Sequence, residues 1–253
     1  MVTPFDIQSA QFLNPLVPAF KIASGDNNFY PLIEAVASLN KPILLSGGIA
    51  TLAELQYTVD FIRRIWNKNR TPQDLAVLHC VASYPTEKNE ANLKAIESLK
   101  KLNVTVGYSD HTIGIDAAIL SVALGARVIE KHFTIDKNYS DFRDHKIAAD
   151  PKDLAELVKR VREAEIMLGD GVKRAMPSEE LNREKVRRSI AVRRDMKAGE
   201  TLQVADLIWV RPGNGLAPGE ESSVVGRPLA KPAKKGQILT MNDLAEFESS
   251  KNG

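Results

Sequence analysis

Five short apolar runs alternate with helical stretches between residues 19 and 169, and this alternation constrains the fold more than any other feature. The runs begin every 22 to 33 residues, the spacing expected of βα units in a parallel sheet. None leads into a Gly-x-Gly-x-x-Gly turn, so the pattern favours a (β/α) barrel over a dinucleotide-binding fold. The runs are 20–23, 42–46, 75–80, 104–108 and 127–133.

Helix start signals occupy the stretches between the runs. Thr51 and Glu54 have the spacing of a capping box, and Asp150 precedes Pro151 as a cap before a proline at the first helical position. Apolar residues then recur at helical spacing, which predicts one buried face for each helix. The expected stripes are Leu52, Leu55, Val59, Ile62 and Trp66 in one helix, and Leu154, Leu157, Val158, Val161, Ala164 and Leu168 in the other.

The number of units predicts only part of a barrel. A complete TIM barrel has eight βα units, and five can be counted here. We therefore expect an α/β fold, a partial (β/α)8 TIM barrel, from which roughly three N-terminal units are absent. Thr3 to Phe5 would be the end of an earlier strand. Residues 1–171 would form this barrel part, 172–187 a charged linker, and 188–253 a small β-rich domain.

The small domain is predicted from an internal repeat. Residues 197–207 and 234–244 share the pattern Lys-x-Gly-x-x-Leu-x-x-x-Asp-Leu at a separation of 37 positions. Each copy reads as a glycine turn, a short strand and an acidic cap, so the same unit is used twice. The turn Arg211-Pro-Gly-Asn-Gly215 lies between the copies and carries one cation.

Composition excludes several classes of function. The chain is 43% hydrophobic and 26% charged, and its net charge of +2 gives no reason to expect nucleic acid as a partner. No apolar run approaches the roughly 18 residues of a membrane span, and the N-terminus lacks the features of a signal peptide. Cys80 is the only cysteine, which suits a reducing compartment. We therefore expect a cytoplasmic protein that does not bind membranes.

Polar residues follow every apolar run, although apolar residues would pack better there. In a barrel the carboxyl ends of the strands converge on the functional site. One polar strand end is as often structural as functional, but five that converge make a site. The strand-end residues are Lys21, Ser24, Ser46, His79, Cys80, Ser109, Asp110, His111, Glu130 and His132.

His111 and His132 are the candidate metal ligands. They end neighbouring runs, and imidazole is a common ligand of divalent transition metals. Two histidines leave room for water and a substrate oxygen, as a Lewis-acid site requires. The alternative is a pair of hydrogen-bonded histidines with a structural role.

Lys21, Ser24, Ser46 and Ser109 are the candidate anion site. A lysine supplies a point charge and serines supply hydroxyl donors, which together suit a phosphate or carboxylate. The alternative is that Lys21 extends to solvent while the serines bond to loop backbone.

Three further residues carry weaker signals. Tyr84 could be a turn aromatic, Asp144 could cap the following helix or bind hydroxyl groups, and Cys80 is expected to be an inert buried thiol.

These motifs together resemble one family, the N-acetylneuraminate (sialic acid) synthases and their nonulosonate relatives. The resemblance covers nearly the whole chain in the family's order, and the repeat module resembles the SAF (antifreeze-like) β-clip domain. The motifs are Phe20-Lys-Ile-Ala-Ser-Gly-Asp26, Leu45-Ser-Gly-Gly48, His79-Cys-x-x-x-Tyr-Pro-Thr86, Gly107-Tyr-Ser-Asp-His-Thr112, Glu130-Lys-His-Phe-Thr134 and Arg211-Pro-Gly-Asn-Gly215.

The resemblance implies condensation of phosphoenolpyruvate with N-acetylmannosamine or a related N-acyl hexosamine, giving a nonulosonic acid and phosphate. It implies a divalent ion held by His111 and His132, usually Mn²⁺, with Mg²⁺ or Co²⁺ as alternatives. It also implies a domain-swapped homodimer in which Arg211 enters the partner's site. The implied catalytic residues are Lys21, Asp26, His111 and His132, and the implied substrate-binding residues are Thr3, Ser24, Ser46, Tyr84, Ser109, Asp144 and Arg211.

The chain departs from the family pattern at several positions. Asp26 stands where a glutamate is common, Ala82 where some relatives have asparagine, and residues 142–143 where Gly-Pro is usual. The family's early strands carry a glutamate, a lysine and an asparagine with no counterpart here, so we expect these 253 residues to be inactive or nearly so. The alternatives are a legionaminate, pseudaminate, 9-phosphate or octulosonate-phosphate type of synthase, or a non-catalytic carbohydrate-binding remnant.

Overall fold

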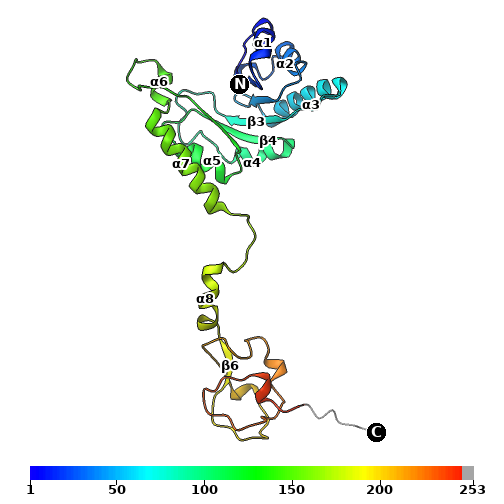
Figure 1. The fold of residues 1–253 in the computed structure, drawn as a ribbon, viewed down its shortest axis with the longest axis vertical. Helices are drawn as coiled ribbons and strands as arrows, with labels where there is room; N and C mark the ends of the chain where they lie inside the picture. Colours follow the sequence, from blue (N-terminus) through cyan, green and yellow to red (C-terminus); the bar gives the residue numbers. More distant parts are fainter. Residues whose placement is uncertain (247–253) are drawn as a thin grey trace. The chain divides into compact units, whose positions relative to one another are not determined.

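The computed structural model describes residues 1–246 and divides into two compact units, Met1–Gly171 and Val172–Gly253 (Figure 1). Each unit has its own hydrophobic core. Within the described residues, no helix combines the length and the apolar character that crossing a membrane would need.

Strands and helices alternate along the first unit, as the spacing of the apolar runs predicts. Short 3-10 turns, η1 (Asn14–Leu16), η2 (Ser24–Asp26) and η3 (Lys100–Leu102), lie between some of them. The strands are β1 (Phe20–Ile22), β2 (Ile43–Ser46), β3 (Leu75–Cys80), β4 (Thr105–Asp110) and β5 (Val128–Lys131). The helices are α1 (Ile7–Leu13), α2 (Tyr30–Ala37), α3 (Leu52–Asn69), α4 (Ala95–Leu99), α5 (Asp116–Ala123), α6 (Arg143–Ile147) and α7 (Pro151–Leu168).

The five strands form one sheet in the order β1-β2-β3-β4-β5, and every neighbouring pair is parallel. Parallel neighbours joined by helical crossovers are the construction of a TIM barrel. The prediction of a partial barrel of five βα units is therefore confirmed.

Single bridges continue the sheet at both edges. Val2 forms a parallel bridge with Phe20, and its carbonyl accepts a hydrogen bond from the Lys21 N–H at 2.8 Å. Phe133 forms a parallel bridge with Ala149 at the other edge. Val2 thus lies beside β1 in a single parallel bridge, just before the residues Thr3 to Phe5 that were predicted to end a strand and that form none here.

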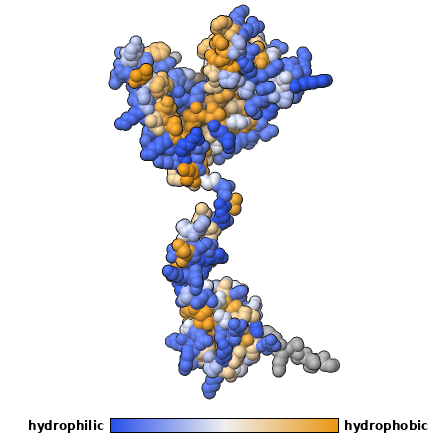
Figure 2. Space-filling model, viewed as in Figure 1, coloured by the Kyte–Doolittle hydropathy of each residue, from blue (hydrophilic) through white to orange (hydrophobic). Residues whose placement is uncertain are grey.

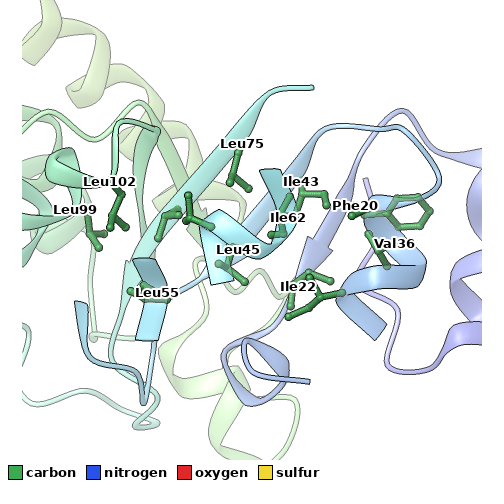
Figure 3. Packing of buried hydrophobic residues seen from close by; sticks show 14 of the residues in the cluster. Phe20, Ile22, Val36, Ile43, Leu45, Leu55, Ile62, Leu75, Leu99 and Leu102 are labelled. Atoms are coloured by element: carbon green, nitrogen blue, oxygen red, sulfur yellow. The ribbon is translucent and has the colours of Figure 1, made fainter. Parts of the chain in front are cut away.

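One face of the sheet packs against the helices. Alternate residues of β1 and β2, Phe20 and Ile22 with Ile43 and Leu45, are fully buried on this face. Figure 3 shows them beside Val36 of α2 and Leu55 and Ile62 of α3. Full burial of such side chains contributes about 1.5–3 kcal/mol each. In Figure 2 hydrophobic surface of the first unit gathers in the hollow between the end that carries α1 and α2 and the end that carries α6 and α7.

The predicted helix caps are present in α3 and α7. The Glu54 carboxylate accepts from the Thr51 N–H at 2.7 Å, and Thr51 Oγ1 accepts from the Glu54 N–H at 3.3 Å. Asp150 accepts from the Asp153 N–H at 2.8 Å at the start of α7. These bonds satisfy donors that a helix N-terminus otherwise leaves unpaired.

The two predicted apolar stripes differ in their burial. In α3 Leu55, Val59, Ile62 and Trp66 are buried, and only Leu52 is 37% exposed. In α7 Leu157 alone is buried, so the prediction of a buried stripe there is wrong. The helix packs mainly against α5, and this leaves Leu154, Val158 and Leu168 at 40%, 52% and 48% exposure.

The second unit begins with a helix that the sequence analysis assigned to the linker. α8 (Pro177–Val186) starts at a proline, and the Glu179 carboxylate accepts from the Met176 N–H at 2.7 Å. Its Glu184 carbonyl accepts from the Gly213 N–H at 2.6 Å. The linker segment is therefore partly helical and contacts the loop that carries Arg211.

The rest of the second unit is a small β-rich fold. β6 (Ser189–Val192) and β7 (Leu207–Val210) pair antiparallel, and 3-10 turns occupy η4 (Val204–Asp206), η5 (Glu221–Ser223) and η6 (Met241–Asp243). Its buried cluster is Ile190, Val192, Met196, Leu202, Leu207, Leu216, Val224, Leu229, Ala233, Leu239 and Leu244.

The two repeat copies are related by a local twofold arrangement of hydrogen bonds. The Gly199 N–H donates to the Leu229 carbonyl, and the Gly236 N–H donates to the Val192 carbonyl, each at 2.8 Å. Donors and acceptors in this pair of bonds are both 37 positions apart. Gly199 and Gly236 have φ values of 79° and 84°, a conformation that favours glycine. The repeat therefore marks two copies that pair with each other.

Candidate active site

The strand register brings five predicted strand-end groups to one face of the sheet. Side chains alternate along a strand, and paired residues of neighbouring strands share a face. Cys80 pairs with Ser109, and Ser109 pairs with Glu130. Following the pairing through β2 and β1 adds Ser46 and Lys21 to the same face. This face is opposite the helix-covered face.

Glu130 joins the predicted anion-binding residues through its carboxylate. Ser109 Oγ donates to Glu130 Oε1 at 2.7 Å, and Lys21 Nζ lies 3.4 Å from the same oxygen. Lys21 is 4% exposed, so it does not extend to solvent. Glu130 is one of the polar strand ends in the sequence, but its position there predicts no particular role for it. Two groups that could donate to a bound anion, the Lys21 ammonium and the Ser109 hydroxyl, therefore meet at the same Glu130 oxygen.

Ser46 and Ser24 extend this group towards the ends of β1 and β2. Ser46 is 2% exposed, and its Oγ has no hydrogen-bond partner among the described residues. Buried hydroxyls are normally bonded, so this one has an unused capacity that a ligand oxygen would satisfy. Ser24 Oγ accepts from the Gly48 N–H at 3.1 Å. A Cβ at Gly48 would lie 2.6 Å from Ser24 Oγ, so this close approach requires glycine.

Asn27 holds the two loops that carry these serines. Its Nδ2 donates to the carbonyls of Ser46 at 3.2 Å and Gly48 at 2.9 Å. Thr58 Oγ1 of α3 donates to the Asn27 backbone carbonyl at 3.0 Å. Sequence reasoning missed Asn27, because its partners are 19 or more positions away and follow no periodic pattern.

His111 and His132 lie side by side at the ends of β4 and β5. Their ring centroids are 5.2 Å apart, with the ring planes inclined by 75°. His111 Nδ1 is 2.8 Å from the Val81 carbonyl oxygen, which can only accept, so Nδ1 carries the proton and Nε2 keeps its lone pair. Burial lowers the pKa of His111 below its usual value, so the ring favours the neutral form that a metal ligand needs.

Tyr84 and Asp144 lie beside the two histidines. The Tyr84 ring centroid is 4.1 Å from that of His111 and 5.7 Å from that of His132. Asp144 Oδ2 is 4.0 Å from His132 Nδ1. Two predicted sugar-contacting residues are thus near the predicted metal ligands.

The donor set fits a divalent ion held by imidazole nitrogen with further positions left open. Within the described residues, no group of three or more His, Cys, Asp or Glu side chains is arranged to hold a metal. A metal held here would therefore have two histidines as its protein ligands, and that role stays a prediction. The Asp144 carboxylate lies near His132.

Two strand-end residues, His79 and Asp110, lie on the face of the sheet opposite this site. His79 faces the helix side of the sheet, where Nε2 is 2.8 Å from the Ala91 carbonyl and the ring stacks on Tyr108. The expectation that all five strand ends converge is wrong for His79, because alternation turns it away while Cys80 faces the site. Burial raises the pKa of the Cys80 thiol, in keeping with an inert buried cysteine.

Three further predicted site residues are Thr3, Asp26 and Arg211, and none of the hydrogen bonds, ion pairs and ring contacts described above involves them. Thr3 follows Val2 at the edge beside β1, and Asp26 lies in η2 after Ser24. Arg211 is exposed and belongs to the second unit. Their predicted roles in binding and catalysis stay predictions.

Comparison with known families covers both units. Residues 1–173 match the profile of the NeuB family, and residues 187–245 match the SAF domain. An uncharacterised protein of Methanocaldococcus jannaschii is 44% identical over 244 residues, which are 96% of this chain and 71% of the relative. The N,N'-diacetyllegionaminic acid synthase of Campylobacter jejuni is 40% identical over 239 residues, 94% of this chain and 70% of that protein. The pseudaminic acid synthase of the same organism is 39% identical over 243 residues, with shares of 95% and 69%.

Solved structures agree with the sequence relatives. The N-acetylneuraminic acid synthetase of Leptospira borgpetersenii superposes with a TM-score of 0.65 and 37% identity, over 71% of this chain and 61% of that one. A spore coat polysaccharide biosynthesis protein of Bacillus subtilis superposes with a TM-score of 0.60 and 30% identity, over 96% of this chain and 72% of that one. The chain spans about 70% of the length of its curated relatives. On its sequence, its half-barrel and its C-terminal SAF domain, this chain belongs to the NeuB family.

Proposed function

We propose that this chain forms the substrate and metal site of a nonulosonic acid synthase. The reaction would condense phosphoenolpyruvate with an N-acyl hexosamine such as N-acetylmannosamine or its diacetylated relatives. The observation that carries the proposal is the meeting of an anion cradle, Lys21, Ser46 and Ser109, with two adjacent imidazoles at one end of the sheet. The 40% identity to a legionaminic acid synthase supports this substrate class.

The cradle would bind the anionic groups of phosphoenolpyruvate. Lys21 supplies a buried positive charge, and Ser46 Oγ supplies an unused donor. Glu130 holds the Lys21 ammonium and the Ser109 hydroxyl towards one another before a ligand arrives. Holding the enol carbon in one place beside the sugar removes much of the entropic cost of the encounter.

His111 and His132 would hold a divalent ion, with Mn²⁺ as the proposed metal. When bound, such an ion polarises the sugar aldehyde as a Lewis acid. The Val81 carbonyl fixes the His111 tautomer, and the Tyr84 ring limits the rotation of the imidazole. In the overall reaction the methylene carbon of phosphoenolpyruvate would bond to the aldehyde carbon, whose oxygen takes up a proton; water would add at the carbon that bears the phosphate, and loss of phosphate would leave the 2-keto group.

The proposed assembly is a domain-swapped homodimer in which Arg211 enters the partner's site. Support comes from the loop that carries this residue. Ser189 Oγ donates to the Pro212 carbonyl at 2.8 Å and accepts from the Gly215 N–H at 2.9 Å. The loop is therefore fixed on both sides of its turn while Arg211 stays exposed.

Binding and turnover test the proposal separately. We expect the purified chain to bind Mn²⁺, measured by electron paramagnetic resonance, and phosphoenolpyruvate, measured by calorimetry. Phosphate release should require both ligands and an N-acyl mannosamine. Activity with only the 6-phosphorylated sugar would assign the 9-phosphate type instead.

Two variants with a matched control make the binding test specific. His111→Ala should abolish Mn²⁺ binding, and Lys21→Met should weaken phosphoenolpyruvate binding. His79→Ala should leave both affinities unchanged, because this ring faces the opposite side of the sheet. A chain that binds neither ligand, or a His111→Ala variant that binds Mn²⁺ normally, would refute the proposal.

A further inference from the structure

A buried ion pair lies directly behind the two histidines. Asp110 ends β4, Lys131 ends β5, and the strand register pairs them. Lys131 Nζ is 2.9 Å from Asp110 Oδ2, with side chains that are 4% and 0% exposed. Each partner immediately precedes a predicted metal ligand, His111 or His132.

The same pair holds the backbone on the far side of His111. Lys131 Nζ also donates to the Thr112 carbonyl at 2.9 Å. Asp110 Oδ1 accepts from the Thr112 N–H at 2.8 Å and from Thr112 Oγ1 at 2.7 Å. Tyr108 donates to the same oxygen at 3.3 Å, and burial raises its pKa, so its hydroxyl keeps the proton. His111 is therefore bracketed by two residues that both bind Lys131.

The pair cannot itself touch a ligand in the candidate site. Ser109 and Glu130 face that site, so alternation directs Asp110 and Lys131 to the helix side. Stability alone also explains the pair poorly. Replacing a buried ion pair by apolar residues is often neutral or stabilising, because the charges lose their hydration.

We propose that Asp110, Lys131 and Thr112 form a clamp that sets the separation and orientation of His111 and His132. Asp110 and Lys131 are then positioning residues for the metal site, acting through the backbone of the two strand ends. This inference rests on the two-histidine metal site of the proposed function. It gives a role to two charged residues that the reaction does not use directly.

The clamp predicts that metal affinity depends on residues that do not contact the metal. Lys131→Met leaves the Asp110 carboxylate buried without a partner and frees the Thr112 carbonyl. We expect Mn²⁺ affinity to fall by about 10- to 100-fold, as is usual when the support of a metal ligand is removed. The visible absorption of bound Co²⁺ should change as well, because it reports the geometry of the ligands. Lys131→Arg should retain more affinity than Lys131→Met, because it keeps the charge.

A double variant separates positioning from simple destabilisation. Asp110→Asn combined with Lys131→Met leaves no buried unpaired charge, so thermal stability should recover relative to Lys131→Met. Metal affinity should stay low, because the double variant also lacks the hydrogen bond from residue 131 to the Thr112 carbonyl. Val59→Ala in α3 is the control. It should lower thermal stability through the core and leave Mn²⁺ affinity unchanged.

The outcomes distinguish the clamp from the function on which it rests. Wild-type chain that binds Mn²⁺ through His111, together with clamp variants of reduced affinity, supports both. Clamp variants that bind Mn²⁺ and Co²⁺ like the wild type would overturn the clamp and leave the metal site standing. A wild-type chain without Mn²⁺ binding would overturn the metal site, and the clamp with it.

Discussion

Replacing Asn27 by alanine should loosen the connection between the loops that follow β1 and β2. Asn27 is 7% exposed, and its amide donates to the carbonyls of Ser46 and Gly48 at 3.2 Å and 2.9 Å. Alanine keeps the backbone carbonyl that accepts from Thr58, so the substitution removes only the two side-chain bonds.

The magnitude follows from these two bonds and from the space left behind. Each buried hydrogen bond contributes about 1 kcal/mol net, and a buried carbonyl left without its donor raises the cost. The total is about 2–4 kcal/mol for Asn27→Ala. In a unit of this size about 1 kcal/mol shifts the melting temperature by roughly 2–4 °C, so a decrease of roughly 5–15 °C is expected.

The assay is thermal unfolding followed by circular dichroism, with Asn28→Ala as the matched control. Asn28 is the exposed neighbour, and its side chain forms no hydrogen bond within the part of the chain that the structure describes, so its replacement should shift the melting temperature by less than about 2 °C. Equal shifts for the two variants would refute the assignment of Asn27 as the tie between the loops.

Two further predictions concern other parts of the chain. Burial lowers the pKa of His79, so on acidification below about pH 6.5 the unfolded chain takes up a proton before the folded chain and stability falls. His79→Gln should therefore lose less stability than the wild type when urea unfolding at about pH 5 is compared with about pH 7, and an unchanged difference would contradict this. In the second unit, Ser189→Ala removes the hydroxyl that bonds Pro212 and Gly215, and should cost about 1–3 kcal/mol in chemical unfolding. A loss within error of zero would show that the loop is held by other contacts.

The sequence predicts the local elements of the fold well. Apolar runs separated by capped helices predict five parallel strands, and Thr51 and Asp150 cap their helices as expected. Local signals suffice here, because strand spacing, caps and periodicity are properties of neighbouring residues. Burial of α7 is different. The apolar stripe of this helix indicates that a partner would stabilise it, but the stripe does not indicate which residues cover it. In the structure Leu154 and Val158 are exposed.

The sequence predicts which residues form the candidate site but not the contacts that hold them in place. Strand ends identify Lys21, Ser109, His111 and His132, because position along a strand can be read from the sequence. The roles of Glu130 and of the Asp110–Lys131 pair depend on the register between β4 and β5. In each of these contacts the two partners are 21 positions apart in the chain. Alternation within one strand does not fix that register, so only the structure reveals these contacts.

The paired repeats of the second unit make its folding a joint event. The copy that contains Gly199 obtains acceptors from the segment before the second copy, and Gly236 obtains its acceptor from β6 ahead of the first. Neither half can satisfy its own main chain in isolation. A nick in the connection between them would leave two fragments whose exposed backbone groups match, so this domain should tolerate being split and should reassemble by complementation.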